Sequence, residues 1–418
     1  MNDSKDASLH VVVVGAGIVG VATAEWLRRD GHKVTLVDER PPGEGTSYGN
    51  AGILARGAVI PVPTPGILTK APGMLLRKDG PLFLRWGYLP RLLPWLIQYL
   101  RSARRDRVET IASALAHLLT DTVDQHLALA RGTPAERWIC TDDYLYLYRS
   151  QADFDRDAFG WQLRGAHGVT IEPMQRAALE DLDPHLGPRY QFAVRMQQHG
   201  HIKDPGRYVK DLSDWFTAQG GHFLQHRVED IRPAESGVQI VCQGTTLDAD
   251  RVVLASGVWT GELAKKIGHK TGIEAERGYH VEFVDAAPMP VLPYMLADRK
   301  LVLTPMDGRL RAAGLVEFGG VDAAPDKAPI RLLKAAARDT YPSLTFSECL
   351  EWMGSRPSTS DSLPLLGASP AHKTVYFACG HQHIGLTAGP KSGRIIADLI
   401  AGRTSNRDLS AFAVDRFD

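Results

Sequence analysis

A glycine-rich loop near the N-terminus constrains the fold more than any other feature of the sequence. Residues 11–14 are consecutive valines, which predict a short strand buried on both faces. They run directly into GAGIVG at 15–20, a GxGxxG loop, and residues 18–29 then predict a helix. A second strand is predicted over 33–37 and ends in Asp38. Strand, loop, helix, strand and terminal acid in this order predict a βαβ unit that binds a dinucleotide.

Each residue type in this unit has a physical role in holding a pyrophosphate. The first glycine permits a tight turn, the second lets the phosphates approach the backbone, and the third allows the helix to pack closely on the strand. Free N–H groups and the dipole at the helix start favour the phosphates, and a terminal carboxylate accepts hydrogen bonds from ribose hydroxyls. The cofactor contacts expected here are Gly15, Gly17, Ile18, Gly20, Asp38 and Glu39.

Composition excludes several classes of protein. Lys plus Arg and Asp plus Glu each number 48, so the net charge is zero and no nucleic-acid partner is expected. The 4 cysteines form no CxxC pair, which argues against a disulfide scaffold or a zinc cluster and favours a reducing compartment. The longest run without strongly polar residues, 11–24, is shorter than the about 18 residues that span a bilayer. We therefore expect a cytoplasmic protein with no metal site.

The rest of the chain alternates between regular and irregular stretches, which predicts two domains that are each assembled from separate segments. We assign residues 1–65, 200–270 and 352–418 to a dinucleotide-binding domain because they show strand, glycine-rich turn and helix patterns. Residues 66–199 and 271–351 are assigned to a substrate-binding domain. The predicted fold class is α/β, with a Rossmann-like domain joined to an α+β domain that contains a mixed sheet.

The loop does not by itself distinguish NAD from FAD. No other GxGxxG follows a strand, and the chain has no CxxC pair. Enzymes that pass electrons from a nicotinamide through a flavin to a redox disulfide usually need both features. If the chain binds a flavin, we expect its electrons to come from a small organic substrate.

Four further motifs, in order along the chain, resemble those of the D-amino acid oxidase/dehydrogenase superfamily. They are GTSYGNAG at 45–52, RGY at 277–279, WMGSRPSTSD at 352–361 continuing as LPLLG at 363–367, and GHQHIGLT at 380–387. The likeness is closest to the bacterial D-amino acid dehydrogenase branch of small-subunit type, which includes hydroxy-D-proline dehydrogenase-like enzymes. The resemblance implies a FAD-binding domain of the glutathione-reductase-like type and FAD as the cofactor.

The resemblance also implies further flavin contacts. A helix beginning near residue 385 would direct its positive end at the edge of the flavin where negative charge develops. Some relatives attach the flavin through a Cys near the arginine motif or a His near the N-terminal loop, and neither residue is present there, so noncovalent FAD is expected. The implied contacts are Ser47, Asn50, Ala51, Gly52, Ser256, Gly257, Gly380, His381, Ile384, Gly385, Leu386 and Thr387.

Three side chains are implied at the substrate. Arg356 would clamp a substrate carboxylate through a bidentate pair and so orient the substrate Cα–H; its alternative is an internal ion pair with an acid such as Asp361. Tyr279 would hydrogen-bond to the same carboxylate, and its alternative is an ordinary strand aromatic. His383, like His381, would contact flavin or substrate or have a structural role. No general base is identified.

The function implied is FAD-dependent oxidative deamination of a D-amino acid or cyclic imino acid, with an acyclic imine product hydrolysed to keto acid and ammonia. A sarcosine- or glycine-type amine oxidase on the same fold is the nearest alternative. An NAD-dependent dehydrogenase and a non-catalytic flavin-binding subunit are more distant alternatives. A quinone, an electron-transfer protein and oxygen all remain open as the electron acceptor.

A basic cluster within residues 77–107 has two interpretations. It resembles a membrane-surface patch, which would place the protein peripherally on the inner face of the cell membrane and suit electron delivery to a quinone. The favoured interpretation is a lid of the substrate domain whose arginines are solvated, because prolines interrupt any long amphipathic helix. The cluster comprises Arg77, Lys78, Arg85, Arg91, Arg101, Arg104, Arg105 and Arg107.

Overall fold

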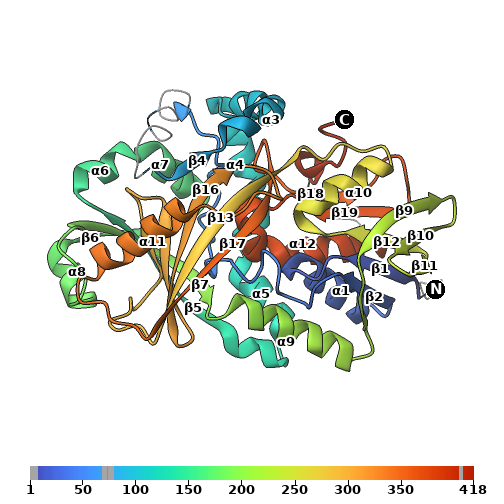
Figure 1. Ribbon diagram of the computed structural model, residues 1–418, viewed down its shortest axis with the longest axis horizontal. Helices are drawn as coiled ribbons and strands as arrows, with labels where there is room; N and C mark the ends of the chain where they lie inside the picture. Colours follow the sequence, from blue (N-terminus) through green and yellow to red (C-terminus); the bar gives the residue numbers. More distant parts are fainter. Residues whose placement is uncertain (1–7, 68–72, 74–79, 404–407) are drawn as a thin grey trace.

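The computed structural model describes residues 8–67, 73, 80–403 and 408–418. Figure 1 shows two sheets side by side along the long axis, each with its own covering helices. The first sheet is parallel except for one edge strand, β18, which pairs antiparallel with β19. In spatial order its strands are β18 (Leu365–Ala368), β19 (Val375–Cys379), β12 (Arg251–Leu254), β1 (His10–Val14), β2 (Lys33–Asp38) and β8 (His222–Gln225).

The valines of β1 show why this strand is central. Val11 and Val13 pack on the helical side, whereas Val12 and Val14 face a small antiparallel sheet, and all four are at most 3% exposed. Because both faces are covered, the strand is apolar throughout rather than alternating. The helical side holds α1 (Ile18–Arg29), α9 (Pro205–Ala218) and α12 (Gly385–Ile400), and the small sheet holds β9 (Val228–Ala234), β10 (Gly237–Cys242) and β11 (Thr245–Ala249).

The second sheet is large and mixed. Its face turned away from the first sheet is covered by α11 (Lys327–Thr340), which packs on β13 and β16 (Figure 1). Its main path runs through β17 (Glu348–Thr359), β13 (Ile273–Val284), β16 (Arg309–Phe318), β15 (Leu301–Met306), β14 (Tyr294–Leu296), β5 (Ile139–Tyr148), β7 (Phe192–Ile202) and β3 (Ile53–Leu54), with β4 (Leu82–Leu84) beside β16 and β6 (Ile171–Gln175) beside β7. A Rossmann-like domain next to a mixed sheet confirms the predicted fold class.

The remaining helices connect or cover these sheets. They are α3 (Leu89–Ser102), α4 (Arg105–Leu119), α5 (Thr122–Ala130), α6 (Gln151–Arg156), α7 (Ala158–Ala166), α8 (Arg176–Leu182) and α10 (Thr260–Lys266). No helix within the described ranges is long and apolar enough to cross a membrane.

The packing divides the chain differently from the expected segments at two places. The boundary at residue 352 falls inside β17, whose whole length pairs with β13 of the large sheet. Helices α4 and α5, from the segment 66–199, bury their apolar faces in the same cluster as α1 and α12. Helix α12 packs against α1, α4 and α5 together.

Candidate active site

A cavity of about 610 Å³ lies at the carboxyl ends of the parallel strands β1, β2, β12 and β19. Clefts of this size hold drug-sized ligands, and ligands in open α/β sheets bind at this edge. The predicted contacts that line it are Gly15, Gly17, Ile18, Asp38, Glu39, Ser47, Asn50, Ser256, Gly257, His381, Gly385 and Leu386. The cavity thus brings together segments from both ends and the middle of the chain.

The other predicted contacts lie outside the lining of this cavity. The Ala51 carbonyl accepts a hydrogen bond from Thr304, and the Thr387 hydroxyl donates to the Ile53 carbonyl. These bonds tie the loop and the start of α12 to the large sheet and to each other. The residues in this second group are Gly20, Ala51, Gly52, Gly380, Ile384 and Thr387.

The glycines of the GxGxxG loop differ in what a side chain would meet. A Cβ on Gly15 would lie 2.5 Å from the Ala255 carbonyl oxygen, and one on Gly20 would lie 1.8 Å from that of Gly15. These two glycines are therefore required for the chain to pack on itself. A Cβ on Gly17 would meet only the Ser47 hydroxyl, at 3.2 Å, so this glycine leaves space on the cavity side. That space fits the close approach of a pyrophosphate.

Polar groups from two segments meet at the start of α1. The Asp38 carboxylate accepts hydrogen bonds from the backbone N–H of Ala16 at 2.7 Å and of Arg40 at 2.9 Å. Burial nevertheless raises the pKa of Asp38 above its ordinary value. The Ser47 hydroxyl accepts from the Ile18 N–H at 2.9 Å, at the first turn of the helix. Asp38 is placed to accept from a ribose, and Ser47 lies where phosphates would bind.

Gln382 provides a further test of whether a cofactor fits. Its side-chain nitrogen donates to the Thr359 carbonyl at 3.0 Å, which fixes the orientation of the amide. The oxygen Oε1 is buried without a hydrogen-bond partner among the described residues, and the residue lines the cavity. It also adopts a left-handed φ of 47°. A buried acceptor without a donor fits a ligand that carries an N–H, as the flavin ring does.

Arg356 lies on β17 directly opposite Glu276 of β13. Its Nη1 donates to the Glu276 carboxylate at 2.7 Å and to the Leu315 carbonyl at 3.1 Å. The internal acid beside Arg356 is therefore Glu276. Asp361, the alternative partner considered from the sequence, instead accepts from Arg416 at 2.8 Å.

The two histidines of the 380–387 loop have different environments. His381 is buried, its Nε2 lies 2.9 Å from the Ser392 hydroxyl, and burial lowers its pKa to about 3. The ring of His383 is exposed, and Glu276 and Arg356 are its charged neighbours. Desolvation by the surrounding protein lowers the pKa of His383, and Arg356 adds to this effect while Glu276 opposes it. The structure thus brings His383 and Arg356 together.

Tyr279 does not join them. Paired residues in an antiparallel ladder share a face and successive residues alternate, so Glu276 and Arg356 lie on one face and Tyr279 on the other. The Tyr279 hydroxyl donates to Glu317 and accepts from the Asp326 N–H at 3.0 Å. The geometry corrects the expectation that Tyr279 binds the carboxylate held by Arg356. The ring packs under α11 instead.

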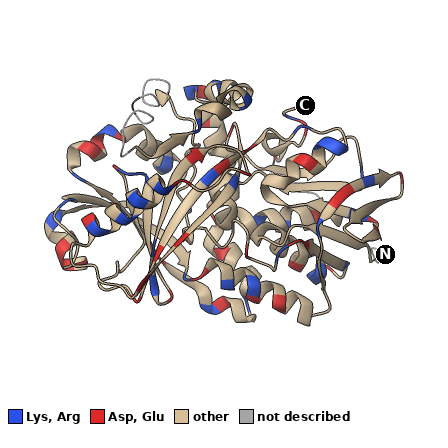
Figure 2. Ribbon diagram, viewed as in Figure 1, with Lys and Arg blue, Asp and Glu red and all other residues tan. Residues whose placement is uncertain are grey.

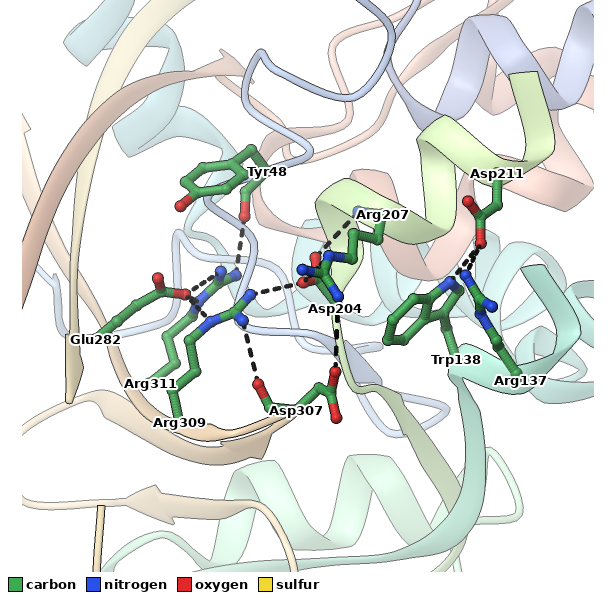
Figure 3. Close-up of polar contacts among 10 residues, drawn as sticks. All are labelled: Tyr48, Arg137, Trp138, Asp204, Arg207, Asp211, Glu282, Asp307, Arg309 and Arg311. Carbon is green, nitrogen blue, oxygen red and sulfur yellow. Dashed lines mark hydrogen bonds and ion pairs between the residues drawn. The ribbon is translucent and has the colours of Figure 1, made fainter. Parts of the chain in front are cut away.

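An ion network holds the loop 45–52 against the large sheet (Figure 3). The buried Arg311 donates to the carbonyl of Tyr48 at 2.8 Å and to that of Asn50, and its Nε donates to Glu282 at 2.9 Å. Burial would raise the pKa of Glu282, but Arg311 and Arg309 hold it below its ordinary value. Arg311 therefore fixes the two backbone carbonyls beside the cavity.

The sequence contained a signal for Glu276 and Glu282, which are not among the predicted site residues. Even-numbered positions of β13 carry Glu274, Glu276, Gly278, His280 and Glu282. Polar residues at every second position of a buried strand indicate a face that contacts something other than an apolar core.

Known proteins give the site its context. Residues 10–399 match the DAO family, described as FAD dependent oxidoreductase. A D-amino-acid oxidase from Bradyrhizobium diazoefficiens is 36% identical, with 98% of this chain and 99% of that protein covered. A D-amino acid dehydrogenase from Paramagnetospirillum magneticum is 31% identical, with 98% and 99% covered.

A solved structure supports the fold independently. The crystal structure of glycine oxidase from Geobacillus kaustophilus superposes with a TM-score of 0.74 at 22% identity, covering 98% of this chain and 100% of that one. At this identity the likeness concerns the fold. The family match, to FAD dependent oxidoreductases, decides against the more distant alternative of an NAD-dependent dehydrogenase. The chain belongs to the DAO family of FAD-dependent oxidoreductases, and its cofactor is FAD.

Proposed function

We propose that this protein oxidises the Cα–N bond of a D-amino acid or a cyclic imino acid, with FAD held noncovalently. The observation that carries the proposal is Arg356 on β17, which lies beside the 380–387 loop and has His383 as a neighbour. A planar guanidinium there suits a substrate carboxylate. Relatives that cover the whole chain bear the names D-amino-acid oxidase and D-amino acid dehydrogenase, which supports this substrate class.

Each part of the site has a distinct task in this reaction. FAD, when bound, supplies the two-electron acceptor for the substrate hydride. Gly15, Gly17 and the start of α1 bind the pyrophosphate, and Asp38 accepts from the ribose. The N–H groups at the start of α12 stabilise negative charge at the cavity wall. Arg356 binds the carboxylate and thereby orients the Cα–H.

Helix α3 covers the substrate side of the site. Its Trp95 indole N–H donates to the carbonyls of Gly272 at 3.1 Å and Ser358 at 3.2 Å. Trp95 is 8% exposed and stacks on Tyr99. We infer that α3 acts as a lid that excludes water, so that an acyclic imine is hydrolysed to keto acid and ammonia only after release.

The membrane interpretation of 77–107 stays a prediction. Arg77 and Lys78 lie outside the described residues. Leu93 of the lid and Trp86, in the turn that precedes it, are exposed. Figure 2 shows basic and acidic residues interspersed over both domains, with both signs present near α3.

The decisive experiment is an anaerobic substrate panel on the purified, yellow protein. We expect the flavin absorbance to bleach with at least one D-amino acid or D-proline analogue and the flavin to be released on denaturation. Bleaching by N-methylglycine or glycine alone would favour the glycine-type amine oxidase. A flavin that no amine bleaches would overturn the proposal and favour a non-catalytic subunit. Repeating the active pair with oxygen and with an artificial dye then identifies the class of acceptor.

A further inference from the structure

We propose that Glu276 binds the ammonium group of the substrate, so that Glu276 and Arg356 together recognise a zwitterion. This inference rests on the proposed function and adds a second substrate-binding residue to it. It concerns the amino group, for which the motifs of the sequence provide no partner.

The register of two strands creates the pair. Glu276 and Arg356 are directly opposite in the β13–β17 ladder, and a 2.7 Å ion pair joins them. The Ser358 hydroxyl donates to the other carboxylate oxygen of Glu276 at 3.0 Å. Further along the same face, His280 and Trp352 stack at 5.0 Å, and Trp352 lies against Gly49 of the cavity loop. The ion pair therefore lies on the face turned toward the flavin loop.

The charges of this pair are complementary to those of an amino acid. A ligand that carried only a carboxylate would bring a second negative charge beside Glu276, whose side chain is only 7% exposed and so is weakly screened by solvent. A ligand that also carries an ammonium group one carbon away offers Glu276 an opposite charge. Each buried charge is then paired, which is the condition for burying it without a large cost.

Arg356 can bind the carboxylate without releasing Glu276. Its Nη1 is engaged by Glu276 and Leu315, and its Nη2 lies 3.4 Å from the Gly314 carbonyl oxygen. No described residue accepts a hydrogen bond from Nε. The Nε–Nη2 edge of the guanidinium is the one that forms bidentate pairs with carboxylates.

No other charged group around Glu276 can take its role. His383, the nearest titratable residue of the 380–387 loop, has a pKa lowered by burial and is neutral at neutral pH. Tyr99 of the lid has a pKa raised by burial and also by Glu276, so its hydroxyl is neutral as well. Glu276 is thus the carboxylate that pairs with Arg356.

The test compares two ligands that differ in the amino group alone. For wild type and Glu276→Gln holoenzyme, kcat/KM is measured with the best D-amino acid of the panel, and the inhibition constant is measured for its deamino carboxylic acid. We expect Glu276→Gln to lower kcat/KM by about tenfold or more, because a charged hydrogen bond is lost. The deamino acid should bind as tightly as to wild type, or more tightly.

The matched control is Glu274→Gln. Glu274 lies two residues away on the same strand, and it accepts from Tyr88 rather than from Arg356. Its replacement should leave both constants unchanged.

Several outcomes would overturn the inference. Equal losses for both ligands would show that Glu276 only positions Arg356, and no loss for either would show that it does not touch the substrate. If Glu276→Gln fails to retain flavin, the same two constants are measured for Glu276→Asp. This variant keeps the negative charge, so it should still favour the D-amino acid over its deamino carboxylic acid. A wild type that no amine bleaches would instead defeat the proposed function, so the two failures are distinguishable.

Discussion

Single residues on β13 show how strand alternation separates neighbours in sequence. Arg277 and Tyr279 belong to the motif that resembles the family, yet both contact Glu317, and the ring of Tyr279 packs under α11. Glu276, which the motif does not include, faces Arg356. The chemistry of β13 is therefore assigned by the face on which a side chain lies, and the motif alone does not give that face.

This assignment predicts opposite results for two conservative variants. Arg356→Lys should lower kcat/KM by about tenfold or more, because an ammonium lacks the planar fork that pairs with a carboxylate. Tyr279→Phe should change kcat/KM by less than about twofold, but should lower the free energy of unfolding by about 1–3 kcal/mol, because a buried hydrogen bond to Glu317 is lost. Steady-state kinetics and denaturant unfolding measure the two effects.

Flavin content serves as the control for both variants and should remain that of wild type. A large loss of kcat/KM in Tyr279→Phe without loss of stability would restore Tyr279 to the substrate site.

At the scale of elements, the start of α1 combines two requirements in one short loop. A side chain on Gly15 or Gly20 would clash with backbone of their own domain, whereas one on Gly17 would meet only the Ser47 hydroxyl. Gly17 has a φ of −75°, which alanine adopts without strain. The loop is therefore separable into glycines that the fold requires and one that the ligand requires.

A matched pair of alanine variants tests this separation. Gly17→Ala should fold with the melting temperature of wild-type apoprotein but bind FAD more weakly, because the methyl group occupies the space beside Ser47. Gly20→Ala should lower the melting temperature of the apoprotein itself, because its Cβ cannot fit against the Gly15 carbonyl. Titration of apoprotein with FAD and thermal unfolding measure the two effects. Equal loss of stability in both variants would refute the separation.

At the scale of the whole molecule, buried histidines make the stability of the protein depend on pH. Burial lowers the pKa of His126 and His199 to about 4, and that of His280 and His381 to about 3. In the unfolded chain each would take up a proton near pH 6.5. Between about pH 6.5 and 4 the unfolded state thus binds more protons, so the stability from these residues is complete above that window and is lost as the pH falls.

We expect the free energy of unfolding to decrease from pH 6.5 to pH 4, with each buried histidine contributing up to about 1.4 kcal/mol per pH unit. Denaturant unfolding at constant ionic strength measures the slope. His126→Gln should flatten it, because a neutral amide replaces a group that bonds to Tyr208 and the Leu386 carbonyl. His185→Gln is the control, since His185 is exposed and should leave the slope unchanged. If His126→Gln left the slope unchanged, the predicted contribution of His126 to the pH dependence of stability would be wrong.

The sequence by itself determined the dinucleotide site, the fold class and the family motifs. These depend on residues adjacent in the chain: apolar runs, glycines at turns and a terminal acid, whose structural effects are local. Most of the predicted cofactor contacts line the cavity.

Only the tertiary structure decided which groups face Arg356. Glu276 and Arg356 are separated by 80 positions, and their contact depends on strand register. The orphan acceptor of Gln382, the fold of α3 over the site and the opposite orientation of Tyr279 depend likewise on packing between distant segments. Local patterns do not encode register, because a shift of one residue exchanges every side chain between the two faces of a strand.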